Sequence, residues 1–328
     1  MSGGMDSDRR KRDGLTGDSM PTQQEYHSAS LQESLSRVID LQLPGFHDHV
    51  RTGDVGQRSF REMPSETWYR NFIRQVTAAM GKHHFPVYRM ADGEFIFAVG
   101  WIPEVESGRY GASTRLWKSA KKFIQSLGKN GDCGNPTVWG ETYPDRQNLL
   151  PHFVRCVRSV SEQGLLALHF TRSPGHFSEE YFGPMCDWFE KNEIALTVDN
   201  YTSFYFVYAL LCGPECSELL KERSLLLVTS ADESKQERIS RYLLRKGARR
   251  IQFLGISPDR SLLDRIDLGI VEDPVDLALV AGGIGSVNIL DQLKPLKTAC
   301  LDIGICMEIF ADPGKRGRTF TVPDGPVD

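Results

Sequence analysis

Two carboxylates separated by one glycine, at Asp92, Gly93 and Glu94, follow the apolar stretch at residues 85–88 and then Arg89. The apolar stretch predicts a short buried strand. Like charges this close repel each other unless a cation lies between them. Mg²⁺ and Mn²⁺ prefer oxygen ligands and keep positions open for substrate phosphates. One hypothesis is therefore a metal-dependent site for a phosphorylated substrate. The alternative is that Asp92 only caps the helix that follows.

A glycine-rich turn late in the chain, Gly282, Gly283, Gly285 and Ser286, is the second candidate. It precedes a predicted helix, and free N–H groups at a helix start form a cradle for phosphate. The turn is neither a Walker loop, which requires a following lysine, nor a standard dinucleotide fingerprint. A tight turn with a purely structural role is the alternative.

Four further polar residues at or after predicted strands are candidates for binding or catalysis: Arg89, His169, Asp199 and Ser230. Arg89 has two open interpretations, a contact to phosphate or an ion pair with Asp92. His169 is either a neutral buried histidine bonded to the backbone or a residue that binds the acceptor or acts as a general base.

The positions of these residues depend on a predicted alternation of strands and helices. Strands are predicted at residues 85–88, 165–170, 194–198, 224–228, 250–254, 276–280 and 298–303. Helices are predicted at residues 65–80, 95–99, 117–127, 149–160, 179–190, 201–211, 235–244, 261–266 and 287–293. Continuously apolar strands separated by helices indicate a mostly parallel sheet covered on both faces. We therefore predict a Rossmann-like, doubly wound α/β fold, whose ligand lies beyond the carboxyl ends of the strands near a switch point.

Composition limits the class of protein. The chain has 328 residues, 40% of them hydrophobic, and a net charge of -4 with a pI near 6.1, which argues against a nucleic-acid binder. The chain has seven cysteines, an odd number, and no Cys-x-x-Cys pair, so neither a disulfide framework nor a zinc ribbon is suggested. Free cysteines favour a location in the reducing cytoplasm. A signal peptide and a membrane span are not expected.

Three segments are expected along the chain. Residues 1–60 predict a partly disordered extension with an amphipathic piece at residues 31–43, because their first part is polar and contains a basic cluster. Residues 61–312 are expected to form the catalytic domain. Residues 313–328 predict a C-terminal tail rich in Gly, Pro and Arg.

The order of these motifs resembles the GT-D-fold glycosyltransferases. In that family an Arg-x-x-Asp-Gly-Glu segment follows an early strand, and a glycine-containing turn and a strand that ends in Asp-Ile-Gly come later. The corresponding segments here are Arg89-Met90-Ala91-Asp92-Gly93-Glu94, Gly282-Gly283-Ile284-Gly285-Ser286 and Leu301-Asp302-Ile303-Gly304. The resemblance covers roughly residues 64–310.

The chain departs from that family at two positions. The family usually has a histidine after Asp-Ile-Gly, where this chain has Ile305, followed by Cys306, Met307 and Glu308. Glu308 or Asp302 could replace the histidine as a metal ligand. The late turn is Gly-Gly-Ile-Gly here, where the family tends to have a Gly-Pro-Thr type of sequence.

The resemblance implies a glycosyltransferase that uses a nucleotide-diphosphate sugar, with UDP-sugar as the expected donor. Asp92, Glu94 and Glu308 are the implied ligands of Mn²⁺ or Mg²⁺. Arg89, Gly93, Ser230 and the late glycine turn are implied at the donor, and His169 or Asp199 at the acceptor as a base. The acceptor is a glycan, a peptide or a small metabolite, and the oligomeric state, a homo-oligomer included, is left open. The alternative is a non-catalytic module of the same fold that binds a nucleotide or a sugar nucleotide.

Overall fold

The computed structural model describes most of the chain from residue 65 to residue 313. The described residues are 65–100, 145–168, 177–197, 199–213, 215–272, 274–304 and 306–313. Several predictions lie outside them: the N-terminal extension, the helix at residues 117–127, His169, Ile305 and residues 314–328 of the tail.

The described residues form one sheet of seven parallel strands. The strands are β1 (Phe85–Met90), β2 (Leu165–Leu168), β3 (Tyr201–Ser203), β4 (Ser224–Thr229), β5 (Arg250–Gly255), β6 (Leu277–Ala281) and β7 (Ala299–Asp302). Their spatial order is β3-β2-β1-β7-β6-β4-β5. The prediction of a parallel α/β sheet is confirmed. The chain moves outward from β1 on one side and returns to it through β7 on the other, so the switch point lies between β1 and β7.

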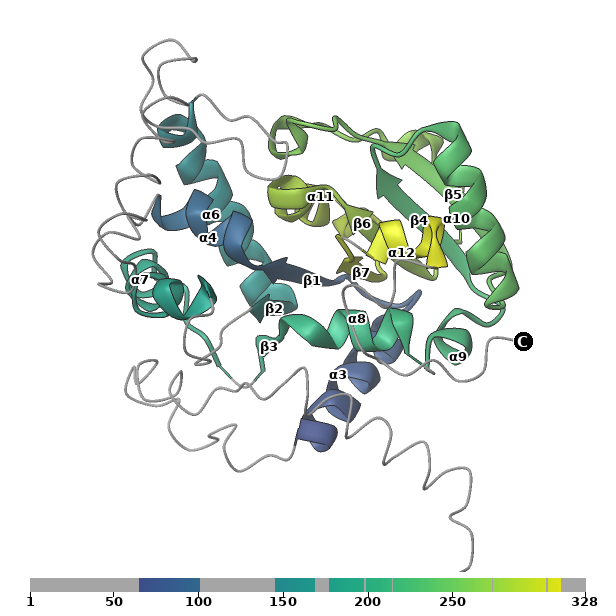
Figure 1. Ribbon diagram of the computed structural model, residues 1–328, viewed down its shortest axis with the longest axis horizontal. Helices are drawn as coiled ribbons and strands as arrows, with labels where there is room; N and C mark the ends of the chain where they lie inside the picture. Colours follow the sequence, from purple (N-terminus) through teal and green to yellow (C-terminus); the bar gives the residue numbers. More distant parts are fainter. Residues whose placement is uncertain are drawn as a thin grey trace, which may run out of the picture.

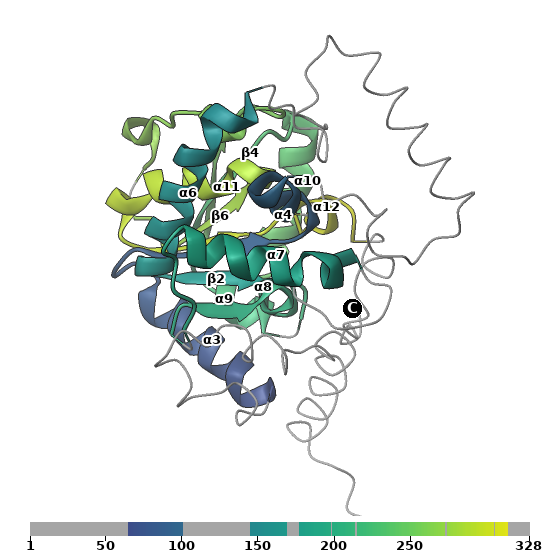
Figure 2. The same cartoon turned by 90° about the vertical axis from the view of Figure 1, so that its left-hand side faces the viewer.

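Helices cover both faces of this sheet. The α-helices are α3 (Ser65–Ala79), α4 (Asp92–Val99), α6 (Arg146–Gln163), α7 (Phe177–Lys191), α8 (Phe204–Cys212), α9 (Cys216–Leu220), α10 (Glu233–Arg245), α11 (Ser286–Gln292) and α12 (Cys306–Ala311). Short 3-10 turns are η3 (Ser261–Leu263), η4 (Leu268–Ile270), η5 (Gly283–Gly285) and η6 (Lys294–Leu296). Figures 1 and 2 show α6 and α11 on one face and α3 and α8 on the other. Helix α12 packs between α8 and α10, and α4 continues β1 beyond the edge of the sheet.

The central strands are buried on both faces, which explains their continuously apolar sequences. Every residue of β4 and β7 is buried, as are all but the first residue of β1. Parallel strands covered by helices on both sides need this pattern, because neither face meets water. The polar residues in these strands, such as Arg89 and Asp302, therefore have to find partners inside the protein.

The predicted strand at residues 194–198 is wrong. The structure has no strand at residues 194–197 and instead forms β3 at Tyr201–Ser203, where a helix was predicted. The cause is Asn200, whose side chain accepts a hydrogen bond from the N–H of Thr197 at 2.6 Å and donates to the carbonyl of Ala195 at 2.7 Å. Such a local turn replaces ladder hydrogen bonds and delays the strand.

Other differences are smaller. Helix α4 begins at Asp92 and not at residue 95, and α9 and α12 were not predicted. The helix predicted at residues 261–266 is the shorter 3-10 turn η3. Within the part of the chain described above, no helix is both long enough and apolar enough to cross a membrane.

Candidate functional site

The carboxyl ends of three neighbouring strands, β1, β7 and β6, bring together several of the predicted site residues. Arg89 lies near the end of β1, Asp302 ends β7, and Gly282 to Ser286 follow β6. The three strands are adjacent in the sheet, and the switch point lies between the first two. This is the edge at which ligands bind in open parallel sheets.

Arg89 is held almost entirely by the protein itself, with 6% of its surface exposed. Its Nε donates a hydrogen bond to the carbonyl of Asp302 at 2.7 Å, and Nη1 donates to the hydroxyl of Tyr208. The guanidinium carbon lies 4.7 Å from the ring centre of Phe204 and 4.5 Å from that of Tyr208. Burial alone lowers the pKa of Arg89, but Tyr208 and Asp302 outweigh it and raise that pKa above its ordinary value.

These contacts settle the partner of Arg89 within the described residues. The carboxylate beside it is that of Asp302, with Nη2 3.7 Å from Oδ1, whereas one of the two interpretations open from the sequence paired Arg89 with Asp92. The guanidinium also packs so closely on Gly304 that a Cβ atom there would overlap with Nη2. Gly304 has φ +40°, a conformation that also favours glycine. Arg89 therefore fixes the ends of β1 and β7 to each other.

Asp302 links the β1 end to the β6 end. Its Oδ2 accepts the backbone N–H of Arg89 at 3.2 Å, and its Oδ1 accepts the hydroxyl of Ser286 at 3.0 Å. Burial raises the pKa of Asp302, although Arg89 and Ser286 act to lower it. A carboxylate in this position stabilises the geometry of both strand ends, but its oxygens are already occupied by protein donors.

Glu94 is the described carboxylate of the Asp-Gly-Glu turn. It lies in the first turn of α4, and its Oε2 accepts the N–H of Ala91 at 2.9 Å, as the glutamate of a capping box does. Burial raises the pKa of Glu94 to about 7; the charge of Asp302 adds to the effect, while Ala91 and Arg89 oppose it. Glu94 is therefore a carboxyl group that changes charge near neutral pH, at the switch point of the sheet.

Asp92 is the first residue of α4, and the residue that precedes the helix is Ala91. Asp92 therefore does not occupy the N-cap position, and the capping contact that the structure describes is made by Glu94. The side chain of Asp92 lies outside the described part of the structure. Gly93 is buried within the same turn.

A metal ion at this turn is compatible with the donor chemistry of Glu94. Hard divalent cations bind carboxylate oxygens, and a positive charge would offset both causes that raise the pKa of Glu94. Among the described residues, however, no group of three or more His, Cys, Asp or Glu side chains is arranged to hold a metal ion. A complete ligand set therefore requires donors beyond the described side chains, among which Asp92, solvent and the substrate are candidates.

The glycine turn after β6 is largely satisfied by its own neighbours. The N–H of Gly282 donates to the hydroxyl of Ser286 at 3.0 Å, and the carbonyl of Gly282 accepts the hydroxyl of Ser261 at 2.5 Å. A Cβ atom on Gly285 would overlap with Ser261 and with the backbone of Leu262. Close packing against η3 thus explains Gly285, which favours the structural interpretation of the turn; Gly283 is exposed.

The structure does not bring all predicted residues to this edge. Asp199 is exposed and precedes β3, so it lies toward the amino ends of the strands, opposite the site. Its placement after a strand is wrong because β3 begins later than predicted. Ser230 does follow β4 at the carboxyl edge and is exposed. Glu308, in the first turn of α12, forms an ion pair with Lys235 of α10. His169 stays a prediction.

Sequence reasoning missed three residues that matter here. Phe204 and Tyr208, which enclose Arg89, lie in an aromatic-rich stretch of the sequence at residues 201–208. Their spacing of four residues on a helix places both rings on one side, a signal that two aromatic side chains act on one partner. Lys235 carries no motif, and its spatial neighbour on α12 could not be predicted from the sequence.

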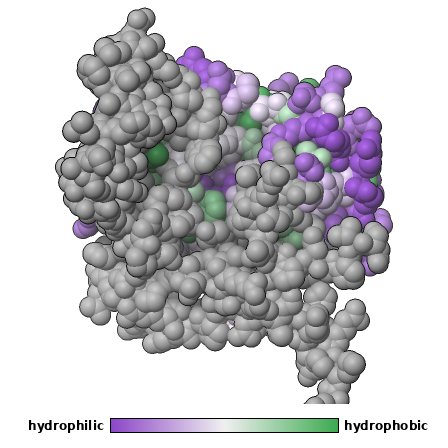
Figure 3. Space-filling view, viewed as in Figure 1, coloured by the Kyte–Doolittle hydropathy of each residue, from purple (hydrophilic) through white to green (hydrophobic). Residues whose placement is uncertain are grey.

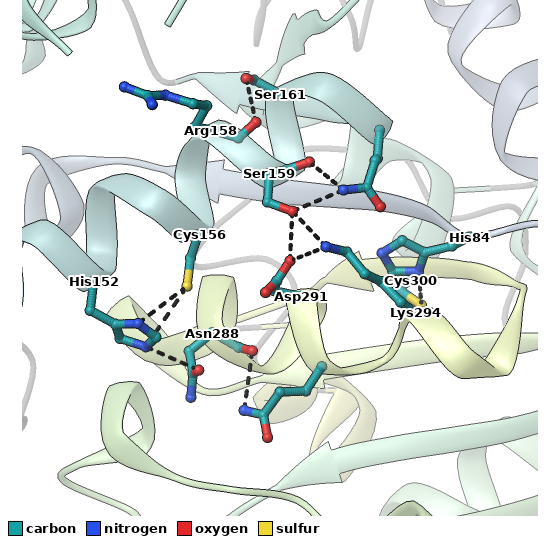
Figure 4. A network of polar contacts seen from close by, with 12 residues as sticks. His84, His152, Cys156, Arg158, Ser159, Ser161, Asn288, Asp291, Lys294 and Cys300 are labelled. Atoms are coloured by element: carbon teal, nitrogen blue, oxygen red, sulfur yellow. Dashed lines mark hydrogen bonds and ion pairs between the residues drawn. The ribbon is translucent and has the colours of Figure 1, made fainter. Parts of the chain in front are cut away.

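A second cluster of polar side chains lies between α6 and α11 (Figure 4). Nε2 of His152 is 3.2 Å from Oδ1 of Asn288, and its two ring nitrogens are 3.9 and 3.8 Å from the sulfur of Cys156. Cys, His and Asn are the residue types of a cysteine nucleophile. Burial, however, raises the pKa of Cys156 to about 12, which keeps the thiol protonated near neutral pH. The contact between His152 and Asn288 joins α6 to α11, and the raised pKa of Cys156 disfavours a role as nucleophile.

The same interface contains a charged group that anchors α11. The hydroxyl of Ser159 donates to Oδ1 of Asp291 at 2.6 Å, and Nζ of Lys294 lies 2.7 Å from the same oxygen (Figure 4). These contacts tie the end of α11 to α6. Because α11 begins at Ser286, they help to hold the β6 end against Asp302.

Comparisons with protein-family models, curated proteins and solved structures found no match to this chain.

Proposed function

We propose that this protein is a metal-dependent glycosyltransferase of the GT-D type, which transfers a sugar from a nucleotide-diphosphate sugar to a hydroxyl or another nucleophile of an acceptor. UDP-sugar is the proposed donor. The observation that carries the proposal is the position of Glu94 at the sheet edge together with the raised pKa of its carboxyl group. A carboxyl group with a pKa of about 7, within an Asp-Gly-Glu turn at the switch point of a parallel sheet, is suited to bind a cation or a proton.

Asp92 and Glu94 are the proposed ligands of Mn²⁺ or Mg²⁺. When bound, the ion would supply positive charge to the diphosphate leaving group. Arg89 acts as a positioning residue in this proposal, because its donors are directed to Asp302 and Tyr208. It holds the end of β1, from which α4 and Glu94 extend, against β7.

The sequence suggested two candidate bases at the acceptor, His169 and Asp199. Only His169 is kept in this proposal. Asp199 is not assigned to the acceptor, because it lies toward the opposite edge of the sheet. A glycan, a peptide and a small metabolite remain the candidate acceptors. A cytoplasmic location remains a prediction from the cysteine pattern.

The proposal is tested by thermal unfolding of the full chain with a panel of nucleotide sugars, with and without Mn²⁺, followed by turnover measurements for each donor that binds. We expect at least one UDP-sugar to raise the midpoint of unfolding, and more so with Mn²⁺, because ligands that bind only the folded state stabilise it. The double variant Asp92→Asn with Glu94→Gln should lose this Mn²⁺-dependent increase. Glu162→Gln, an exposed change on α6, is the matched control.

Unchanged turnover in the double variant would remove Asp92 and Glu94 from the mechanism. Binding of a sugar nucleotide without hydrolysis or transfer, across a panel of donors and acceptors, would instead favour the non-catalytic binding module. Absence of binding for every nucleotide tested would contradict both functions.

A further inference from the structure

The pair formed by Lys235 and Glu308 lies at the same edge of the sheet as the proposed donor site. Lys235 is in the first turn of α10, which follows the carboxyl end of β4, and Glu308 is in the first turn of α12, which follows β7. Nζ of Lys235 contacts Oε1 of Glu308 and so joins the two helices. Figure 1 shows α12 between β7 and α10.

Both side chains are accessible to a ligand from solvent. The side chain of Lys235 is 24% exposed and that of Glu308 is 40% exposed. Figure 3 shows that the described surface around α10 is largely hydrophilic. The pair is thus neither sealed in the core nor fully solvated.

A lysine in the first turn of α10 is unfavourable for the helix itself. The start of a helix carries a partial positive charge, so a cation there is unfavourable, whereas an acid is favoured. Asp232 and Glu233 at the start of α10 follow that preference. Lys235 does not, and the carboxylate that it contacts across the carboxyl edge is that of Glu308.

A diphosphate bound at this edge requires positive charge, and Arg89 cannot readily provide it. Its guanidinium is buried between two aromatic rings and bonded to Asp302 and Tyr208. Within the described residues that end β1, β4, β6 and β7 or form the first turn after each, Lys235 is the remaining cationic side chain. An ammonium group has three donors, so Lys235 can keep its contact to Glu308 and still donate to phosphate oxygens.

We propose that Lys235 binds the diphosphate of the donor and that Glu308 is a positioning residue for Lys235, not a metal ligand. This inference rests on the proposed function, since it assigns a further residue to the same donor site.

The test is calorimetric titration of the full-length protein with UDP and, separately, with inorganic pyrophosphate, each with and without Mn²⁺. Lys235→Gln is expected to weaken UDP binding by about tenfold or more, the effect of losing one charge-assisted contact. Lys235→Arg should retain most of the affinity. Lys221→Gln, an exposed change at the amino edge of the sheet, is the control and should alter the affinity by less than about twofold.

Glu308→Gln distinguishes the two roles of Glu308. Its amide oxygen still accepts from Lys235, while a negative charge near the diphosphate is lost, so UDP binding should be unchanged or tighter. If Glu308 is a metal ligand, the same change weakens binding only when Mn²⁺ is present, and the inference is overturned. Thermal unfolding of each variant confirms that the protein titrated is folded.

Two negative outcomes separate the inference from the function on which it rests. If the wild-type protein binds UDP and Lys235→Gln binds it equally well, the inference alone fails. If the wild-type protein binds neither UDP nor pyrophosphate under any condition, the donor site itself is absent and the proposed function fails with it.

Discussion

The β1 end (Arg89 to Glu94) and the β6 end (Gly282 to Ser286) flank β7 at the same edge of the sheet, yet they differ in how their polar groups are satisfied. At the β6 end, hydrogen bonds among Gly282, Ser261 and Ser286 hold the turn, and Ser286 bonds to Asp302. At the β1 end, Glu94 has two backbone donors, the N–H groups of Ala91 and of Glu94 itself, and burial still raises its pKa to about 7.

This difference shows that glycine content alone does not identify a phosphate-binding turn. Gly285 is required by close packing against η3, which would be equally necessary in a protein without a ligand. Glu94 is a different case, because its burial is only partly compensated by the groups around it. A carboxyl group whose pKa is raised by burial is stronger evidence for a functional site than a glycine-rich sequence.

The largest expected effect concerns the contact between the β1 end and β7. Arg89→Met leaves the buried carboxylate of Asp302 without its cation, and removing one partner of a buried pair typically costs about 3–5 kcal/mol of unfolding free energy. Urea unfolding measures this change. Adding Asp302→Asn to Arg89→Met should recover part of the loss; equal losses in the single and double variants would show that the charge of Asp302 is not the cause.

A smaller loss is expected at the β6 end. Gly285→Ala forces a methyl group into Ser261 and Leu262, and overpacking of this kind costs about 1–3 kcal/mol. Gly255→Ala is the matched control, because a Cβ atom at Gly255 would meet no atom within 4 Å. Nucleotide binding should survive in Gly285→Ala after correction for the folded fraction. If Gly285→Ala instead lost nucleotide binding without losing stability, the result would support phosphate binding by the turn.

The third expected effect is a dependence of stability on pH at the β1 end. The pKa of Glu94 is raised from 4.5 to about 7, so the folded state favours the protonated carboxyl group. Its contribution to stability is complete below about pH 4.5 and is lost as the pH rises through about 7. Glu94→Gln should abolish this loss.

The measurement is urea unfolding of the metal-free protein from about pH 5 to about pH 8. The difference in stability between Glu94→Gln and the wild-type protein should shift in favour of the variant across this range. Glu162→Gln, an exposed change on α6, should give a constant difference. Parallel curves for Glu94→Gln and the wild-type protein would mean that the pKa of Glu94 is ordinary, and the contrast between the two strand ends would disappear.

Much of the fold could be predicted because its signals are local. Apolar runs bounded by polar turns gave six of the seven strands to within two residues at each end, and alternation with helices predicted their parallel arrangement. The exception, at residues 194–198, arose because apolar residues alone cannot distinguish a strand from a loop fixed by a side chain such as Asn200. The error moved Asp199 to the wrong edge.

The site could be predicted only in part, because its decisive contacts are not local. The sequence placed Arg89, Glu94 and Asp302 at strand ends, and the structure puts them at adjacent strands. That Arg89 pairs with Asp302 and is enclosed by Phe204 and Tyr208 depends on tertiary packing of β7 and α8. The pair of Lys235 and Glu308 depends on the packing of α10 against α12 in the same way.

The central position of β1 has a consequence for the order in which the molecule is assembled. Arg89 and Asp302 are 213 residues apart in sequence, and β1 pairs with β7, the last strand of the sheet. During synthesis β1 therefore emerges long before the strand that completes its ladder and supplies the carboxylate for Arg89. Contacts this distant form late and slowly. A nascent chain that ends before β7 would present β1 and β6 as open strand edges, which are aggregation-prone until the final strand is inserted between them.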